Sequence, residues 1–344
     1  MEPFPLVIGH SAVKADLMRC LESGRLRGSF LLVGPEGVGR RRLALEVAKA
    51  AACQAGGERV PCGECGTCHR IGRGTSGDVL VLSRPEGKSK IPIEEVRKLL
   101  EEMALAPVES PVRTFVIDGA GDLMEETQNA LLKALEEPPA DVLILLIAER
   151  ASEVIPTILS RCRLLQTGEL SLEQVAEVLR REGVAPEEVE ARARWSNGSP
   201  GQALAEDALD LAEVAQAAVE RLAAGARRDP MGFQELLAEF VQPGKGESRV
   251  QRDRVARLVR LLQRVLRDVL LLREGAQGPL LAGAGRDELG ALAQLPAGRV
   301  ERALDALTAA DDDLSRNANV KLLLDGIALE LSKHLTPALE PHRG

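Results

Sequence analysis

Residues 29–41 read SFLLVGPEGVGRR, a short apolar run followed by a glycine-rich turn. Residues 41–52, RRLALEVAKAAA, then place apolar side chains at helical spacing. A strand, a glycine turn and a helix in this order form a phosphate-binding loop, in which backbone N–H groups cradle phosphates. A decorative turn between two elements is the alternative. The context of the turn favours a phosphate loop.

The loop lacks the two side chains on which nucleotide chemistry depends. A working loop follows the pattern GxxxxGK[ST], where the lysine reaches the terminal phosphates and the hydroxyl ligates Mg²⁺. Here Gly34, Gly37 and Gly39 keep the turn. Arg40 replaces the lysine, however, and Arg41 replaces the hydroxyl residue, and a guanidinium cannot ligate a metal ion. Because the backbone amides remain, the sequence leaves only weak ATP binding open.

A second nucleotide-binding element is also incomplete. Residues 114–118, TFVID, form an apolar strand candidate that ends in an acid, as a Walker B motif does. The carboxylate of Asp118 either helps to hold Mg²⁺ or caps the next turn. Gly119 follows, where hydrolysing proteins carry a glutamate that polarises the attacking water. Since the lysine, the hydroxyl and the base are all missing, we expect no ATP hydrolysis by this chain alone.

The composition limits the class of protein. A length of 344 residues with 45% hydrophobic residues and a net charge of −8 indicates a soluble globular protein rather than a general nucleic-acid binder. Five Phe, one Trp and no Tyr leave little material for a base-stacking platform. No stretch reaches the roughly 18–20 apolar residues of a membrane span. The start, MEPFPLVIGH, is not a secretory signal, so we expect a cytoplasmic protein with no membrane partner.

Apolar runs alternate with helical periodicity in the first half of the chain, which predicts a parallel sheet covered by helices. The strand candidates are residues 29–33, 78–82, 113–118 and 142–148. We expect an α/β domain over residues 1–166, a small helical lid domain over 167–207 and an all-α domain over 208–344, the last with breaks near 242–246 and 283–285.

Four cysteines have the spacing of a metal site. The pattern C-x8-C-x2-C-x2-C is formed by Cys53, Cys62, Cys65 and Cys68. Four thiolates saturate a tetrahedral Zn²⁺ ion and leave no open position for catalysis, so we expect a structural zinc module over residues 53–68. An iron–sulfur cluster, a redox pair and unmetallated thiols are the alternatives. His69 is expected to be a bystander because four cysteines are already present.

Several motifs together resemble one family, the delta-prime subunits of bacterial DNA polymerase III clamp loaders, which are AAA+ proteins. Besides the four-cysteine insert, the motifs are IGH (8–10), GPEGVG (34–39), TQNALLKALEEPP (127–139), TILSRC (157–162), NGSPGQAL (197–204), RDVLLLREG (267–275) and NANVKLLLDGIALEL (317–331). The resemblance spans nearly the whole chain. It implies an AAA+ phosphate-loop domain with a zinc module, a helical lid domain and a C-terminal collar domain.

The resemblance also implies a function that depends on other chains. In this family the arginine of SRC reaches the ATP held by the adjacent gamma or tau motor subunit, which makes Arg161 an arginine finger acting in trans. The alternative for Arg161 is an ordinary surface arginine paired with a carboxylate. The implied partners are the gamma/tau and delta subunits in a heteropentamer, the sliding clamp, and primer–template DNA through the assembled complex. Ala148–Glu149 and Gly201 stand where motor subunits carry their two sensor residues, which agrees with a non-hydrolysing stator.

The C-terminal third contains a long amphipathic helix over residues 249–273. Its apolar face is expected to carry Leu258, Leu262, Val265 and Val269, and another face to carry Arg257, Arg260, Arg264 and Arg267. A solvated or inter-subunit face is favoured over DNA contact, because the resemblance places this helix in the collar. Lys88, Lys90 and Arg97 are weaker candidates for DNA contact.

Two other functions remain open. The first is an active AAA+ ATPase of the gamma/tau type with an unusual loop, which would hydrolyse ATP as the isolated chain. The second is a free-standing zinc-dependent nucleic-acid binder, which would show strongly salt-dependent DNA affinity. The acidic net charge and the few aromatic residues argue against the second.

Overall fold

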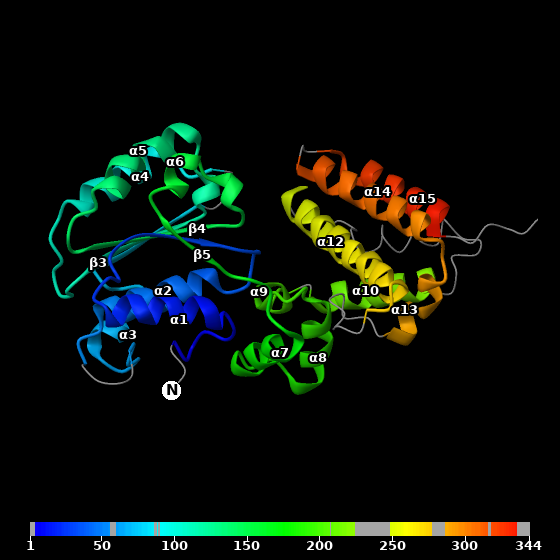
Figure 1. The fold of residues 1–344 in the computed structure, drawn as a ribbon, viewed down its shortest axis with the longest axis horizontal. Helices are drawn as coiled ribbons and strands as arrows, with labels where there is room; N and C mark the ends of the chain where they lie inside the picture. The colour runs from blue at the N-terminus through cyan, green and yellow to red at the C-terminus, as the bar shows by residue number, and fades with distance from the viewer. Residues whose placement is uncertain are drawn as a thin grey trace, which may run out of the picture. The chain divides into compact units, whose positions relative to one another are not determined.

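The computed structural model describes residues 4–55, 60–85, 88, 90–206, 208–223, 248–276, 286–315 and 318–335. The chain divides into two compact units, Met1–Val178 with Ser199–Gly201, and Leu179–Gly198 with Gln202–Gly344. Figure 1 shows an α/β unit and an all-helical C-terminal region. The helix breaks predicted near 242–246 and 283–285 lie outside the described residues.

A five-stranded parallel sheet forms the centre of the first unit. Its strands are β1 (Gly28–Val33), β2 (Val79–Ser83), β3 (Arg113–Asp118), β4 (Val142–Ala148) and β5 (Arg163–Gln166). They lie in the order β2-β3-β4-β1-β5. Every residue of β4 is buried, as expected for a central strand of a parallel sheet covered on both faces. The predicted parallel α/β sheet is confirmed.

The expectation of four strands is incomplete, because β5 forms a fifth. Its four residues, RLLQ, include a single buried side chain, Leu165, and they pair with β1 only. A run this short and this exposed carries too little hydrophobic periodicity to be distinguished from a loop. It matters for the site, because Thr167, directly after β5, donates its backbone N–H to the Val33 carbonyl beside the phosphate loop.

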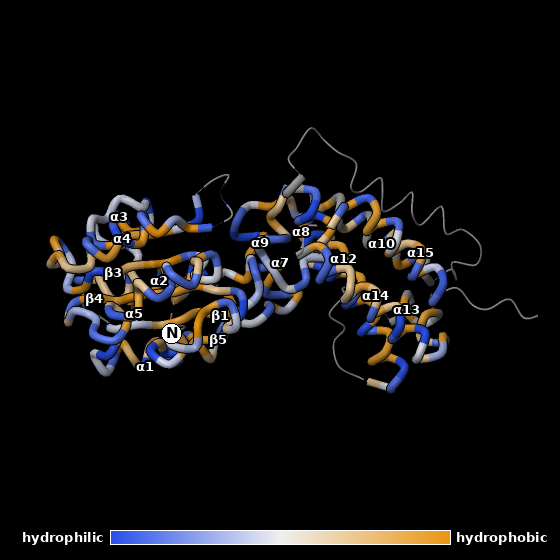
Figure 2. Tube along the Cα trace, turned by 90° about the horizontal axis from the view of Figure 1, so that it is seen from above, coloured by the Kyte–Doolittle hydropathy of each residue, from blue (hydrophilic) through white to orange (hydrophobic). Residues whose placement is uncertain are grey.

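Helices cover both faces of the sheet (Figure 1). On one face lie α1 (Ser11–Glu22) and α2 (Arg40–Ala52), and on the other lie α4 (Ile93–Met103), α5 (Glu125–Glu136) and α6 (Pro156–Leu159). Two separate apolar clusters fill the two interfaces. Figure 2 shows hydrophobic colour along the strands between these layers. The remaining short elements of this part are α3 (Gly66–Gly72), η1 (Ala120–Asp122) and η2 (Ala151–Glu153).

After the sheet, all the regular elements of the described residues are helices. Three short helices come first, α7 (Leu172–Arg181), α8 (Pro186–Trp195) and α9 (Pro200–Ala203). The helices that follow are α10 (Ala208–Ala223), α12 (Ser248–Arg273), α13 (Arg286–Ala293), α14 (Ala297–Ser315) and α15 (Val320–Leu335). None of the helices in the described part of the chain is both long and apolar enough to span a bilayer.

The predicted amphipathic helix is present as α12. Leu258, Leu262, Val265 and Val269 are all buried in one apolar cluster with side chains of α13, α14 and α15. Arg260, on another face, approaches Asp311 of α14 at 3.9 Å. The apolar stripe therefore builds the core of the helical unit, as its spacing predicts.

Candidate functional site

The glycine turn joins β1 to α2 in the way that a phosphate loop requires. Gly37 and Gly39 have φ values of 74° and 98°, a left-handed conformation that glycine adopts without strain. Gly39 is also the N-cap residue of the 13-residue helix α2. The first N–H groups of a helix have no intrahelical partner and carry partial positive charge, so the backbone still suits an anion.

Arg41 forms an ion pair with the strand-end acid of β3. Its Nη1 lies 3.3 Å from Oδ2 of Asp118, and the Asp118 side chain is 26% exposed. In a hydrolysing site these two positions would supply a hydroxyl and a carboxylate to the same Mg²⁺ ion. Here the guanidinium itself neutralises the carboxylate. A divalent cation that binds Asp118 would have to compete with this guanidinium for the carboxylate.

Arg40 points to the neighbouring strand instead of remaining free for a phosphate. Its Nη1 donates to the backbone carbonyl of Ala148, at the end of β4. Burial lowers the pKa of the Arg40 guanidinium from its usual range, and the carboxylates of Glu149 and Asp118 act in the opposite direction. Arg40 stays charged, because arginine does not deprotonate in proteins.

The loop borders a cavity of about 770 Å³ whose charges nearly cancel. Its basic lining residues are Arg40, Arg41, Arg84 and Lys90. Its acidic lining residues are Glu36, Asp118, Asp122, Glu149 and Glu153. Arg84 pairs with Asp122 at 3.1 Å, and Lys90 donates to the Gly121 carbonyl at 3.1 Å. A triphosphate entering this cavity would meet carboxylates as well as cations that already have partners.

Three successive carbonyls on the outer side of the loop accept hydrogen bonds from other segments. Ser199 Oγ donates to the Glu36 carbonyl at 2.9 Å, and the Gly201 N–H donates to the Gly37 carbonyl at 2.9 Å. His10 Nε2 bonds the Val38 carbonyl at 2.8 Å, and burial lowers the pKa of this imidazole while the bond opposes the shift. The loop is therefore held from outside as well as by its own glycines.

Gly201 lies too close to the loop to carry a side chain. A Cβ atom placed on it would be 2.8 Å from the Gly37 Cα atom, which is closer than real contacts allow. Gly201 stands where the resemblance expects motor subunits to have a second-sensor arginine. In this chain, an arginine at residue 201 would need the loop or the 199–201 segment to move.

Arg161 lies apart from this cavity, in the turn between α6 and β5. Its Nε donates to Glu136 Oε1 at 2.7 Å, and its Nη2 contacts the same oxygen. Its Nη1 donates to the Thr157 carbonyl at 2.9 Å. The Arg161 and Glu136 side chains are 30% and 48% exposed, so the guanidinium is accessible from solvent. The structure thus places Arg161 in an ion pair and does not bring it to the phosphate loop of its own chain.

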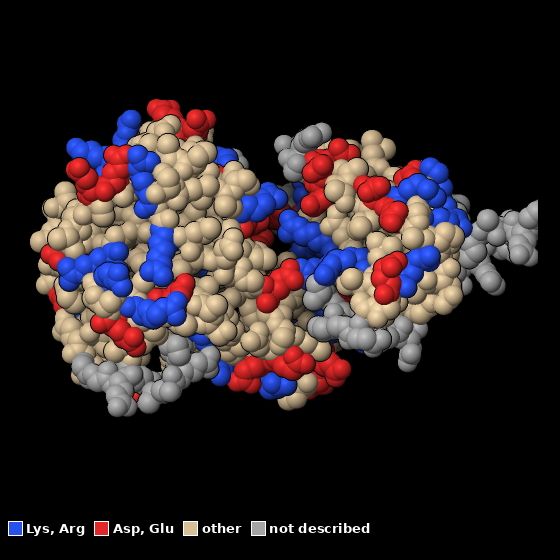
Figure 3. Space-filling model, viewed as in Figure 1, with Lys and Arg blue, Asp and Glu red and all other residues tan. Residues whose placement is uncertain are grey.

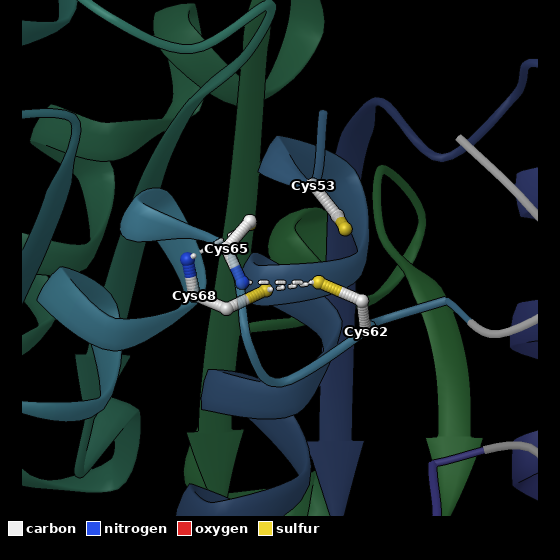
Figure 4. A group of neighbouring side chains, drawn as sticks. All are labelled: Cys53, Cys62, Cys65 and Cys68. Atoms are coloured by element: carbon white, nitrogen blue, oxygen red, sulfur yellow. Dashed lines mark hydrogen bonds between the residues drawn. The ribbon is translucent and has the colours of Figure 1, made fainter. Parts of the chain in front are cut away.

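The four cysteines converge, as their spacing predicts. Cys53 follows α2, Cys65 is the N-cap residue of α3, and Cys68 lies within α3 (Figure 4). Their four Sγ atoms lie within 4.8 Å of one another, and those of Cys62 and Cys68 are 3.9 Å apart. Zinc–sulfur bonds of about 2.3 Å in a tetrahedron place sulfur atoms about 3.8 Å apart. The residues present therefore fit a four-coordinate metal ion.

The surroundings of the thiols suit a metal. The backbone N–H groups of Cys65 and Glu64 donate to Cys62 Sγ at 3.3 and 3.4 Å and lower the pKa of that thiol to about 6. The thiolate is the form that binds metals. Burial raises the pKa of Cys68, a cost that a bound cation would offset. His69 is exposed and is not part of the cluster.

The two other cysteines stand outside the cluster. Cys20 is buried on α1, as expected for a small apolar residue, and its Sγ accepts a bond of 2.8 Å from Arg163 Nη1. Burial raises the pKa of Cys162 to about 12, so that residue is a neutral thiol at pH 7.

Basic and acidic side chains are interspersed on the face drawn in Figure 3. Over the described residues on this face, no broad surface carries positive charge alone. Nonspecific binding of nucleic acid requires such a surface. Lys90, one of the candidates for DNA contact, lines the cavity of the phosphate loop instead.

The parallel sheet, the phosphate loop and the cysteine insert define an α/β domain of the phosphate-loop class. Residues 9–171, which contain all of these features, match the model of a protein family described as "DNA polymerase III, delta subunit". Over these residues the chain is similar to a DNA polymerase III delta-type domain.

Part of the chain is also homologous to the tau and gamma clamp-loader subunits of DNA polymerase III. DNA polymerase III subunit tau of Salmonella typhimurium is 32% identical over 209 residues, which are 59% of this chain and 32% of that protein. The tau subunit of Escherichia coli gives the same values. Subunit gamma of Buchnera aphidicola from Acyrthosiphon pisum is 32% identical over 174 residues, 51% of this chain and 47% of that protein. The chain thus spans about a third to a half of these relatives.

Two solved structures extend over most of the chain. A gamma subunit-related protein of DNA polymerase III from Thermotoga maritima is 18% identical, with a TM-score of 0.47, and covers 93% of this chain and 99% of its own. The DNA clamp loader delta protein of Bacillus subtilis is 11% identical, with a TM-score of 0.35, and covers the same shares.

Proposed function

We propose that this chain is a non-hydrolysing, delta-prime-type subunit of a bacterial DNA polymerase III clamp loader. In this role it assembles with gamma/tau and delta subunits in the cytoplasm and helps to load the sliding clamp onto primed DNA. The observation that carries the proposal is the ion pair between Arg41 and Asp118. It occupies the two positions that would otherwise supply ligands to Mg²⁺.

Three independent features support the absence of hydrolysis. Arg41 cannot ligate a metal ion, Arg40 is engaged by the Ala148 carbonyl, and Gly119 offers no side chain to polarise water. ATP hydrolysis by related folds needs the metal, the cation on the terminal phosphates and the positioned water together. The loop amides by themselves support at most weak anion binding.

Arg161 is the residue that we propose acts on a neighbouring subunit. A guanidinium offers a planar fork of donors that matches phosphate oxygens, and it can stabilise charge on a transferring phosphoryl group. The pair with Glu136 is partly exposed on both sides, and such pairs contribute about 0–1 kcal/mol. A neighbour's triphosphate could therefore replace Glu136 at low cost. Until then, Glu136 holds the guanidinium at the surface.

The test is ATP turnover by gamma/tau subunits mixed with this chain. Replacing Arg161 by Ala is expected to lower the stimulated turnover by about 10³-fold or more at the completed site, since arginine fingers contribute 10³–10⁵. Arg150→Ala is the matched control, because Arg150 is an exposed arginine of the same unit that pairs locally with Glu153. Turnover should be measured at saturating protein, so that weaker assembly is not mistaken for slower chemistry.

Two results would count against this assignment. Equal turnover with the Arg161→Ala and Arg150→Ala chains would show that Arg161 is an ordinary surface arginine. Loss of assembly by the Arg161→Ala chain, detected by size-exclusion chromatography, would show that its role is binding rather than catalysis.

An active motor of the gamma/tau type is the second candidate. The homology of part of the chain to tau and gamma subunits is the observation that favours it. It requires the isolated chain to hydrolyse ATP, which the non-hydrolysing proposal excludes.

We also propose that the four cysteines hold a structural Zn²⁺ ion. Their sulfur-only donor set and compact geometry support zinc, and a site closed by four thiolates leaves no position for a substrate. When bound, the ion would supply cross-linking between the end of α2 and α3, and no catalytic chemistry.

A further inference from the structure

The cysteine cluster is connected to an exposed apolar loop through one residue, Glu109. The cysteine module is defined here as residues 53–54, 60–65 and α3, and the apolar loop as residues 104–110, between α4 and β3. Leu105 and Val108 of this loop are 54% and 83% exposed. The loop therefore presents two large apolar side chains to solvent.

Both ends of the cysteine module contact Glu109. Arg70, two residues after Cys68, donates from Nε to Glu109 Oε1 at 3.1 Å and places Nη2 2.7 Å from Oε2. Gln54, directly after Cys53, donates from Nε2 to the backbone carbonyl of Glu109. The two contacts come from chain segments that the four sulfur atoms bring together. A two-bond arginine–carboxylate fork fixes orientation as well as distance.

A buried carboxylate holds the same part of the loop from inside. Asp78 is fully buried and accepts the backbone N–H groups of Val108, Glu109 and Ser110 at 2.7, 2.8 and 2.8 Å. Burial alone would raise the pKa of Asp78, but these donors outweigh it and leave the pKa below its ordinary value. Ser76 joins the two groups, because its Oγ donates to Glu109 Oε1 and accepts from the Asp78 N–H.

The start of the apolar loop is held differently. Arg113 of β3 donates to the Leu105 carbonyl at 3.4 Å and pairs with Glu102 at 2.6 Å. The cysteine module thus contacts the loop at Glu109, between Val108 and Ser110, whereas Arg113 of the sheet holds the part around Leu105.

We infer that metal loading of the cysteine module fixes residues 108–110 and thereby sets the shape of an exposed apolar surface. The path runs from the metal-bound thiolates through Arg70 and Gln54 to Glu109. Without the metal, the four thiols lose their common centre, and the two donors lose their fixed separation. This inference rests on the proposed metal binding by the cysteines and is independent of the clamp-loader assignment.

The test is hydrogen exchange of the full-length chain, read by mass spectrometry at the amides of residues 108–110. Zinc content is measured first. Removal of zinc by a strong chelator is expected to raise exchange at these amides by about tenfold or more, because their protection depends on local opening. The amides of β4 report on the integrity of the sheet and should stay protected.

Arg70→Gln separates the path from the metal. With zinc still bound, this variant is expected to raise exchange at residues 108–110, while Arg73→Ala, an exposed arginine at the C-cap of the same helix, should not. Because zinc stays bound, this comparison remains decisive even if removing the metal unfolds the chain.

Two results would overturn the inference. One is a zinc-loaded Arg70→Gln chain whose exchange at residues 108–110 matches the unmodified chain. The other is an unmodified chain that binds no zinc, in which case metal binding itself is wrong.

Discussion

At the residue scale, Arg41 changes what a phosphate loop can hold. Its guanidinium lies 3.3 Å from the Asp118 carboxylate, and the two side chains are 55% and 26% exposed. A partly exposed pair contributes only about 0–1 kcal/mol to stability. The pair matters more for Mg²⁺ binding than for stability, because the carboxylate that would attract Mg²⁺ already has a cation beside it.

Restoring the lysine and the hydroxyl of a working phosphate loop tests whether the two arginines prevent Mg²⁺-dependent ATP binding. The double variant Arg40→Lys with Arg41→Thr is expected to bind ATP in a Mg²⁺-dependent way, at least about tenfold (about 1.4 kcal/mol) more tightly than the unmodified chain. A compact ammonium and a metal-ligating hydroxyl would replace two engaged guanidinium groups. Titration calorimetry with and without Mg²⁺ measures the change.

Arg42→Lys serves as the control, because Arg42 is a neighbouring exposed arginine outside the cavity lining. Mg²⁺-dependent ATP binding of equal strength by the unmodified and doubly substituted chains would contradict this account of the ion pair.

Single residues differ in how far the sequence predicts them. The glycine turn and the cysteine set are local patterns, and the structure places each where its spacing indicates. The pairing of Arg161 with Glu136 joins residues 25 positions apart. The contact of His10 with Val38 spans 28 positions. Contacts of this kind depend on the path of the chain across the sheet, and no periodicity encodes them. The motif TQNALLKALEEPP contains Glu136 but does not show its partner.

At the element scale, strands that are buried on both faces are predictable and edge strands are not. All seven residues of β4 are buried, and five of the six in β3. Such strands are recognised in the sequence as continuous runs of apolar residues. The edge strand β5 has a single buried residue, so its sequence does not distinguish it from a loop. The cysteine module is only partly predictable from the sequence. The spacing of its cysteines indicates the cluster, but nothing in the sequence indicates its contact with the 104–110 loop.

For the cysteine module, the account predicts the zinc content of the purified chain. The purified chain is expected to hold about one zinc per molecule, because four thiolates fill one tetrahedral site. Cys65→Ala should lose most of the metal, since it removes one ligand and the N-cap of α3. His69→Ala, one residue beyond Cys68, should keep it.

Elemental analysis of the three purified chains measures the metal. A loss of zinc in the His69→Ala chain similar to that in Cys65→Ala would mean that the imidazole is a ligand and that the proposed thiolate set is wrong.

At the scale of the whole molecule, each compact unit has an apolar core of its own. Residues 9–171, which match the delta-subunit family model, contain the altered phosphate loop, the cysteine module and Arg161. In the proposed function none of these features completes a reaction within this chain. The molecule would contribute a cation to a triphosphate bound elsewhere, while the two arginines of its own loop are engaged by Asp118 and by the Ala148 carbonyl.

The most direct measurement of this claim is phosphate release from ATP by the isolated full-length chain in the presence of Mg²⁺. The account predicts no release above the buffer background at any ATP concentration, because Asp118 is paired with Arg41, Arg40 is engaged by the Ala148 carbonyl, and Gly119 has no side chain to polarise water. Steady Mg²⁺-dependent release that Asp118→Asn abolishes would contradict it and would establish the motor function instead.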